Sequence, residues 1–254
     1  MEKFIKNLTK KAGEKLFNYF KKEAGLTSLR GTSKEIITKY DKLIDGFIVQ
    51  EIKRHYPEHS LLTEESGLIR RKSEFMWIID SLDGSGNFAS KNPLFSVCIA
   101  FLVKEEIVLG AIYAPALQEF YFAKKGEGAF LNERKISVSR VKELKKSYLV
   151  YCEGNEKKRR KFAQILTKIY PKVTEIRKIG SAGIESAWIA AGRADAYFTT
   201  QIDPWDVAAG VLLVKEAGGK ISTFKGKEWQ IKRDNLLFSN GRVHSQLLKY
   251  LKKI

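Results

Sequence analysis

Apolar residues recur along the chain at two different spacings, and these spacings separate predicted helices from predicted strands. Over residues 4–20 they return every three to four positions, which predicts an amphipathic helix. The polar stretch 31–35 predicts a loop. A second helix is predicted from about Asp41 to His55, with its apolar side chains on one face.

The middle of the chain predicts strands. Residues 75–79 form a continuous apolar run, which is typical of a buried central strand. The runs 95–103 and 107–113 are separated only by a short charged gap, which indicates an antiparallel hairpin. Shorter strands are predicted at 61–62 and 119–123.

The last hundred residues alternate between the two patterns. We expect strands at 148–151, 174–179, 194–198 and 220–223, and helices at 156–169, 182–191 and 205–217. The chain is therefore predicted to be an α+β protein, with an antiparallel half over residues 1–150 and an alternating α/β half over residues 151–254.

Composition excludes several classes of protein. Because 44% of the 254 residues are hydrophobic, the chain can bury a core, which excludes disorder as its main state. Three scattered His residues argue against a zinc or copper site. Two cysteines, no apolar leader at the start and no long uncharged apolar window predict a cytoplasmic protein without membrane spans.

The net charge of +17 leaves two interpretations open. Basic residues are spread along the whole chain, often in pairs, which favours a solvated basic surface. The alternative is a nucleic-acid-binding protein, with the basic run at 157–161 as its best support. That alternative predicts an affinity for RNA or DNA that falls steeply with salt.

Asp80 and Asp83 stand at the end of the apolar run at 75–79 and are followed at once by small residues. If the backbone turns at Leu82, both carboxylates and the Leu82 carbonyl can point to one side. Two carboxylates about 4 Å apart repel by roughly 1–4 kcal/mol, so such a site favours a bound cation. Oxygen ligands select Mg²⁺, Mn²⁺ or Ca²⁺.

Two other interpretations of this segment are weaker. A hairpin turn at Asp83-Gly84 conflicts with the next strand, which begins about ten residues later. Residues 84–89 also fit the G-x-G-x-x-A outline of a dinucleotide site. However, a βαβ crossover does not follow, and two acids would face the pyrophosphate. The small residues would still let backbone N–H groups approach a phosphate.

Four further acidic residues are candidates. Glu64 and Glu65 follow the short strand at 61–62, although exposed Glu pairs are common. Asp206 lies in the first turn of a predicted helix, where the helix dipole favours an acid. Asp41 opens the second predicted helix and could equally be a helix cap.

Taken together, these segments resemble the inositol monophosphatase family, Mg²⁺-dependent and lithium-sensitive phosphatases of sugar and polyol phosphates. The family pattern D-P-x-D-G-T-x-N-F corresponds to D-S-L-D-G-S-G-N-F at residues 80–88. The upstream E-E-S segment corresponds to 64–66, and W-D-x-A-A-G corresponds to 205–210. The resemblance implies a layered α-β-α-β-α sandwich, commonly a homodimer, with two or three Mg²⁺ ions per site.

The resemblance also implies roles for individual residues. The implied metal ligands are Glu64, Asp80, the Leu82 carbonyl, Asp83 and Asp206. Asp41, Glu65 and the Ser85 hydroxyl are implied to be catalytic, with Asp41 and Ser85 orienting a metal-held water. The implied substrate contacts are the backbone N–H groups of Gly84 and Ser85, the segment Gly180, Ser181 and Ala182, and also Arg177 and Thr199, together with Glu64, Leu82, Asp83 and Asp206.

Three departures from the family pattern bear on the substrate. Ser81 replaces a proline, and Ser85 replaces a threonine but keeps the hydroxyl. Thr199 stands where the animal enzymes have a glutamate for inositol hydroxyls, whereas Arg177 and Lys178 could serve a second phosphate. The expected activity is hydrolysis of a polyol or sugar phosphate, first myo-inositol 1-phosphate, alternatively with fructose 1,6-bisphosphate as a second substrate.

Overall fold

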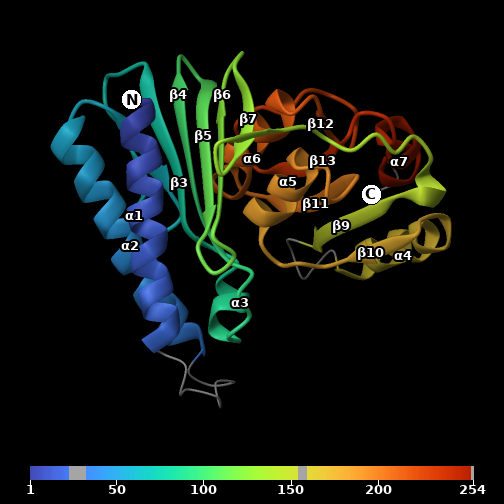
Figure 1. The fold of residues 1–254 in the computed structure, drawn as a ribbon, viewed down its shortest axis with the longest axis horizontal. Helices are drawn as coiled ribbons and strands as arrows, with labels where there is room; N and C mark the ends of the chain where they lie inside the picture. The colour runs from blue at the N-terminus through green and yellow to red at the C-terminus, as the bar shows by residue number, and fades with distance from the viewer. Residues whose placement is uncertain (23–32, 154–158, 253–254) are drawn as a thin grey trace.

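The computed structural model describes residues 1–22, 33–153 and 159–252, which form five alternating layers of helices and sheets (Figure 1). The first layer is a pair of long helices on one face of a large sheet, and the central layer is a pair of helices between the two sheets. A third pair covers the outer face of the small sheet. In that order the pairs are α1 (Glu2–Lys22) and α2 (Ser33–His55), α5 (Ala182–Ala190) and α6 (Pro204–Glu216), and α4 (Arg159–Ile169) and α7 (His244–Leu251).

The large sheet has eight strands in the order β2-β1-β3-β4-β5-β6-β7-β8. Neighbouring strands are antiparallel except for β1 and β3, which run parallel. Its strands are β1 (Ser60–Thr63), β2 (Gly67–Ile69), β3 (Phe75–Asp83), β4 (Ser96–Val103), β5 (Glu106–Ala114), β6 (Glu119–Lys124), β7 (Gly128–Leu131) and β8 (Arg134–Ile136). The predicted central strand at 75–79 and the predicted hairpin are therefore confirmed.

The small sheet has five strands in the order β10-β9-β11-β13-β12. The first three are parallel, and β13 pairs antiparallel with both of its neighbours. Its strands are β9 (Tyr148–Glu153), β10 (Glu175–Arg177), β11 (Ala196–Ile202), β12 (Lys220–Thr223) and β13 (Asp234–Ser239). With its flanking helices it confirms the alternating pattern predicted for the second half.

A bulge near the end of β3 sets the direction of both of its acids. Asp80 pairs with Cys98 and Asp83 pairs with Ser96, so two residues of β3 stand opposite the single residue Val97. In a regular strand, residues three apart face opposite sides, but the extra residue cancels that difference. Both carboxylates therefore face the central helices, as the predicted turn at Leu82 required.

The start of α2 differs from the prediction. Ser33, Lys34 and Glu35 belong to the helix and not to a loop, while Gly31 and Thr32 lie outside the described residues. Lys and Glu are good helix formers, so the polar character of this stretch was a poor reason to predict a loop. Asp41 consequently lies two turns inside α2 and is not its cap.

Several short or late elements were not predicted. They are β2, β7, β8, β13, α7 and a short helix after β3, α3 (Ser85–Ala89). The chain passes from the large sheet to the small sheet between Ile136 and Tyr148. One hydrophobic cluster nevertheless includes residues of both sheets and of α5 and α6. The division into two halves at residue 150 stays a prediction.

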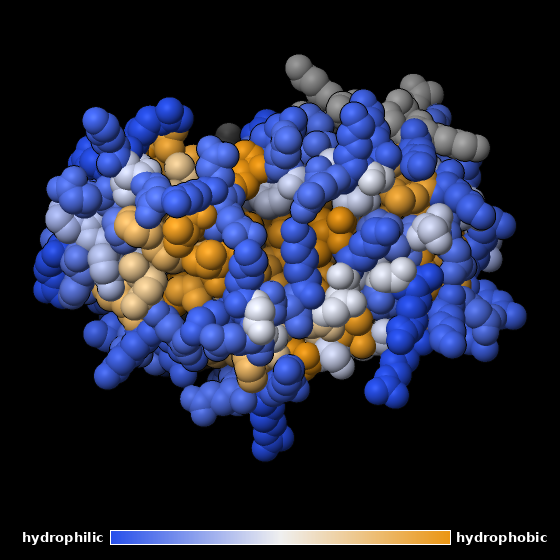
Figure 2. All heavy atoms as spheres, turned by 90° about the horizontal axis from the view of Figure 1, so that it is seen from above, coloured by the Kyte–Doolittle hydropathy of each residue, from blue (hydrophilic) through white to orange (hydrophobic). Residues whose placement is uncertain are grey.

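Hydrophilic side chains project from most of the face seen from above, with apolar patches between them (Figure 2). Of the helices that the structure describes, none combines the length and the apolar character needed to cross a membrane. Cys98 is buried and Cys152 is half-buried, and the two are not joined by a disulfide.

Candidate functional site

Three carboxylates from distant parts of the chain meet at one end of the central layer. Glu64 follows β1, Asp80 lies in β3 and Asp206 lies in the first turn of α6. One oxygen from each lies within 4.8 Å of the others, a spacing at which all three can hold one metal ion. We call Glu64, Asp80 and Asp206 the acid cluster.

Local hydrogen bonds orient two members of the acid cluster. Asp206 is the third residue of α6, and its Oδ2 accepts the backbone N–H of Asp203 at 3.0 Å. This arrangement is half of a capping box, which fixes the carboxylate and leaves Oδ1 available. In the bulge, Asp80 Oδ1 accepts the backbone N–H of Leu82 at 3.1 Å.

Asp83 is buried beside the acid cluster but takes its hydrogen bonds from the other half of the chain. Its Oδ2 accepts the Ser96 hydroxyl at 2.5 Å, the backbone N–H of Gly183 at 3.1 Å and the Ser181 hydroxyl. A side chain at Gly183 would collide with this carboxylate, because a Cβ there would lie 2.8 Å from Asp83 Oδ2. Asp83 thus ties β3 to the start of α5.

Gly84 and Ser85 form the turn from β3 into α3. Gly84 has a φ of +81°, and a Cβ there would lie 2.8 Å from the Leu94 carbonyl oxygen. Glycine is therefore required on both conformational and steric grounds. Asn87, three residues further on, donates to the carbonyls of Leu94 at 2.7 Å and Ile179 at 2.9 Å. The small-residue segment therefore opens a helix and not a hairpin.

Asp41 lies on the side of the site formed by α2. The side chain is buried, and the Asp41 carbonyl accepts the hydroxyl of Ser81 in the bulge at 3.2 Å. Burial and, to a lesser degree, the charges of Glu64, Glu65 and Asp45 raise the pKa of the Asp41 carboxyl to about 8. Asp41 therefore lies near these acids, and its catalytic role and that of Glu65 stay predictions.

The acid cluster has the electrostatics of a cation site. Burial raises the pKa of each of its three carboxyls, and for each of them the charges of neighbouring carboxylates add to that effect. Within the described part of the chain, none of the three forms an ion pair with Lys or Arg. Buried carboxylates are stable as anions only when they are paired or bind a metal. All-oxygen donors at this spacing fit a hard divalent ion.

Of the other predicted substrate residues, some lie beside Asp83 and Gly84 and others do not. Gly180, Ser181 and Ala182 lie at the start of α5, next to Asp83 and Gly84. Arg177 is exposed on β10, where it pairs with Glu175 and donates to the Ile176 carbonyl at 3.1 Å. Thr199 is fully buried in β11. In this structure it therefore presents no accessible surface to a substrate.

Several residues that surround the site were not identified from the sequence. Asp45 lies four residues after Asp41, a spacing that places both on one helical face and could have identified it. Its carboxylate accepts the Ser66 hydroxyl. Asn87 stands in the family pattern at 80–88 but was given no role, and its partner Ile179 lies 92 positions away. Ser96 and Glu185 belong to none of the motifs and were not singled out. The basic residues Lys157 and Lys158, which supported nucleic-acid binding, lie outside the described residues.

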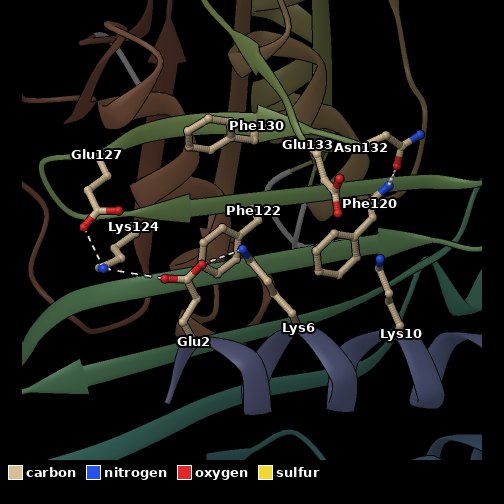
Figure 3. A pocket seen from close by; sticks show the side chains of 10 residues that line it. All are labelled: Glu2, Lys6, Lys10, Phe120, Phe122, Lys124, Glu127, Phe130, Asn132 and Glu133. Carbon is tan, nitrogen blue, oxygen red and sulfur yellow. Dashed lines mark hydrogen bonds and ion pairs between the residues drawn. The ribbon is translucent and has the colours of Figure 1, made fainter.

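A cavity of about 270 Å³ between α1 and the strands β6 and β7 shares no residue with this site (Figure 3). We call it the α1 recess. The ammonium groups of Lys6 and Lys10 lie over the rings of Phe122 and Phe120, 4.1 and 4.8 Å from the ring centroids. Its lining consists of Glu2, Lys6, Lys10, Phe120, Phe122, Lys124, Glu127, Phe130, Asn132 and Glu133. Equal numbers of lysines and glutamates leave it with no net charge to attract an ion.

Comparisons with known proteins agree with the resemblance seen in the sequence. The family model described as "Inositol monophosphatase family" matches residues 1–254. A Thermotoga maritima protein named "Fructose-1,6-bisphosphatase/inositol-1-monophosphatase" is 36% identical, over 87% of this chain and 84% of its own length. The Escherichia coli K12 protein named "Nus factor SuhB" is 35% identical, over 91% of this chain and 87% of its own length.

The fold agrees as well. The structure of an inositol monophosphatase from Anabaena (Nostoc) sp. PCC 7120 superposes with a TM-score of 0.85 at 33% identity, covering 98% of this chain and 93% of that one. The predicted α-β-α-β-α sandwich is thus confirmed by a solved relative. The match over residues 1–254 and the shared fold show that the chain belongs to the inositol monophosphatase family and is a phosphoric monoester hydrolase.

Proposed function

We propose that this chain is a Mg²⁺-dependent phosphatase of polyol and sugar phosphates, with myo-inositol 1-phosphate as its first substrate. The observation that carries the proposal is the acid cluster, three carboxylates within 4.8 Å that form no ion pair with Lys or Arg in the described part of the chain. It stands beside a glycine-led helix start at Gly84-Ser85. Such an arrangement suits a divalent ion that faces a phosphate.

Glu64, Asp80, Asp206, the Leu82 carbonyl and Asp83 are the proposed ligands for two or three Mg²⁺ ions. When bound, divalent ions supply water activation at neutral pH and neutralise the charge that develops on the leaving oxygen. Asp83 suits a bridging role between the halves, because its Oδ2 is already held by Ser96, Ser181 and Gly183. Its other oxygen can then point toward the acid cluster.

Groups of the protein itself would bind the phosphate and orient the attacking water. The backbone N–H groups of Gly84 and Ser85 would bind the phosphate oxygens, and the Ser85 hydroxyl and Asp41 would orient the attacking water. Asp41 is suited to take the proton from that water, since its buried carboxyl lies close to the acid cluster. Glu65 contributes a further negative charge near Asp41.

The proposal includes fructose 1,6-bisphosphate as a second substrate. The Thermotoga maritima relative carries both activities in its name, which supports a dual specificity here. The buried position of Thr199 supports the same conclusion, because a buried threonine cannot replace a glutamate that binds inositol hydroxyls. Gly180, Ser181 and Ala182 would then contact the organic part of the substrate, with Arg177 near a second phosphate.

A substrate panel tests the proposal. Phosphate release should be measured with inositol 1-phosphate, fructose 1,6-bisphosphate, adenosine 3′,5′-bisphosphate and NADP, with Mg²⁺ and with EDTA. We expect Mg²⁺-dependent release from the first two. In ¹⁸O-labelled water, one label should enter each phosphate with inversion at phosphorus. Release that persists in EDTA, or retention at phosphorus, would contradict the proposed route.

A second candidate function comes from the relatives named "Nus factor SuhB". With a net charge of +17, a role on RNA or in a transcription complex could coexist with hydrolysis. Filter binding to RNA at two salt concentrations tests it, because phosphate contacts make the affinity fall steeply with salt. A homodimer, lithium sensitivity and a cytoplasmic location stay predictions from the family resemblance and the composition.

A further inference from the structure

The segment 179–181 is one of the places where the second half of the chain contacts the acids of β3. Its last residue, Ser181, donates its hydroxyl to the Asp83 carboxylate and also caps α5 by accepting the N–H of Ile184 at 3.3 Å. The position of this segment therefore decides whether the Ser181 hydroxyl reaches Asp83. A shift of the segment would leave Asp83 with fewer donors and a changed orientation.

Glu185 holds this segment from inside the protein. It lies one turn into α5, and its side chain is fully buried. A single carboxyl oxygen, Oε1, accepts the backbone N–H of Ile179 at 3.0 Å and that of Gly180 at 3.2 Å. The positive φ of Gly180, +81°, is a conformation that lets successive N–H groups converge on one acceptor.

Asn87 holds the same segment through its carbonyl groups. Its amide donates to the Ile179 carbonyl at 2.9 Å and the Gly180 carbonyl at 3.3 Å. Asn87 belongs to α3, which begins directly after Gly84. The segment is thus held through its N–H groups by Glu185 and through its carbonyls by the proposed phosphate-binding helix.

The second carboxyl oxygen of Glu185 is one of three buried side-chain oxygen atoms from α5 and β11. Glu185 Oε2, the Tyr197 hydroxyl and the Thr199 hydroxyl are all buried, and among the described residues none has a hydrogen-bond partner. The Glu185 and Tyr197 groups are close enough to affect each other's pKa, and burial raises the pKa of Glu185 to about 8. At neutral pH the carboxyl is therefore mostly uncharged, a form that glutamine closely imitates.

We propose that Glu185 is a positioning residue for hydrolysis, which fixes segment 179–181 and thereby holds the Ser181 hydroxyl on Asp83. The inference rests on the proposed function, because it assigns importance to Asp83 as a metal ligand. Glu185 itself touches neither the substrate nor the reacting atoms. Its role requires an acceptor oxygen at the correct reach, and it does not require a negative charge.

Two conservative variants separate reach from charge. Glu185→Gln keeps the acceptor oxygen at the same reach and removes the ability to ionise, whereas Glu185→Asp keeps an ionisable carboxyl and shortens the reach by one methylene. We expect E185Q to retain kcat/KM within about threefold of the wild type. We expect E185D to lower kcat by tenfold or more, with little change in the KM for the phosphate ester, and to weaken Mn²⁺ binding measured by calorimetry.

Asp195→Asn is the matched control. Asp195 is another buried acid that accepts a backbone N–H, that of Tyr148 at 2.7 Å, but its partners lie in the link between the sheets and at the start of β9. It should change thermal stability without changing kcat or Mn²⁺ affinity. A loss of kcat as large as in E185D would show that disturbing any buried acid has this effect, which would overturn the inference.

Hydrogen exchange gives a readout that is independent of catalysis. The amides of Ile179 and Gly180 should be protected in the wild type and in E185Q, and should exchange faster in E185D. The inference fails if both amides exchange freely in the wild type, if E185Q loses as much kcat as E185D, or if E185D matches the wild type. Should the wild type hydrolyse no ester of the panel, the proposed function fails, while exchange and Mn²⁺ binding still decide the role of Glu185.

Discussion

The acid cluster and the α1 recess both contain several carboxylates, but the neighbouring groups shift the pKa of these carboxyls in opposite directions. In the recess, Glu2 lies 2.6 Å from Lys6 and 3.5 Å from Lys124, and these lysines lower its pKa. In the cluster, burial and neighbouring carboxylates raise the pKa of Asp80 and Asp206. In the recess, lysines of the chain itself neutralise the carboxylates. In the acid cluster, no lysine or arginine of the described residues does so.

This difference is informative because the chain has lysines in excess. With 46 basic and 29 acidic residues, the chain has enough lysines and arginines to pair with every carboxylate. The acid cluster instead collects like charges around the buried Asp80, an arrangement that costs stability until a cation binds. Such clusters of perturbed carboxyls are characteristic of functional sites.

Asp80→Asn should give the largest effect on activity. It removes one ligand charge without removing core volume, so kcat/KM should fall by about a thousandfold, roughly 4 kcal/mol of transition-state stabilisation. The metal-free protein should at the same time become more stable by about 1 kcal/mol, because one repelling charge is gone. Steady-state kinetics and urea unfolding in EDTA measure the two effects. More than a tenth of wild-type activity at saturating Mg²⁺ would contradict the assignment.

Metal removal should give the next largest effect. Mg²⁺ at a hundred times its dissociation constant should stabilise the folded protein by about 2.7 kcal/mol. For a chain of this size, that corresponds to a rise in Tm of about 5–10 °C. Thermal melts with Mg²⁺ and with EDTA check the expectation. The shift should be much smaller in the Asp80→Asn variant, and an equal shift there would place the ions elsewhere.

The pH dependence of stability should follow the raised pKa values. In EDTA, Glu185 is protonated in the folded state up to about pH 8 and ionised in the unfolded state above about pH 4. It therefore contributes stability that is complete below the unfolded pKa and lost as the pH rises to about 8. Glu185→Gln should flatten this decline by at most about 1.4 kcal/mol per pH unit. Denaturant unfolding between pH 5 and 8 gives the slope, which would be unchanged if the carboxyl ionised normally.

Glu2→Gln should give the smallest effect. It removes two partly exposed ion pairs in the α1 recess, those with Lys6 and Lys124, which together contribute about 0.5 kcal/mol and less at high salt. Activity and Mg²⁺ affinity should equal those of the wild type, since the recess shares no residue with the acid cluster. A loss of activity in this variant would mean that the two regions are coupled, and the contrast between them would no longer hold.

The sequence predicted those residues of the site that stand out in a short stretch of neighbouring residues. Asp80 and Asp83 stood out because they follow a continuous apolar run, and Asp206 because it lies in the first turn of an apolar helix. The α-β-α-β-α architecture followed from the family resemblance and is confirmed. The assignments of individual metal ligands stay predictions.

The parts that were missed depend on contacts between distant segments. Asn87 bonds Ile179 across 92 positions of the chain, a relation that no local spacing reveals. The strand β13 has polar residues at its start and fits between β11 and β12 by antiparallel pairing. Glu185 looked like an ordinary acid in the first turns of a helix. Tertiary packing, which buries it, gives it its role.

The bulge in β3 makes the count of residues more important there than their identity. Ser81 and Leu82 together occupy the place opposite Val97, so either can change type while the flanking acids keep their direction. Deleting one of them would restore strict alternation and turn one acid toward the aromatic packing beneath α1 and α2. Deleting a single residue would thus remove one acid from the site. The serine at position 81, where the family has a proline, leaves the direction of both acids unchanged.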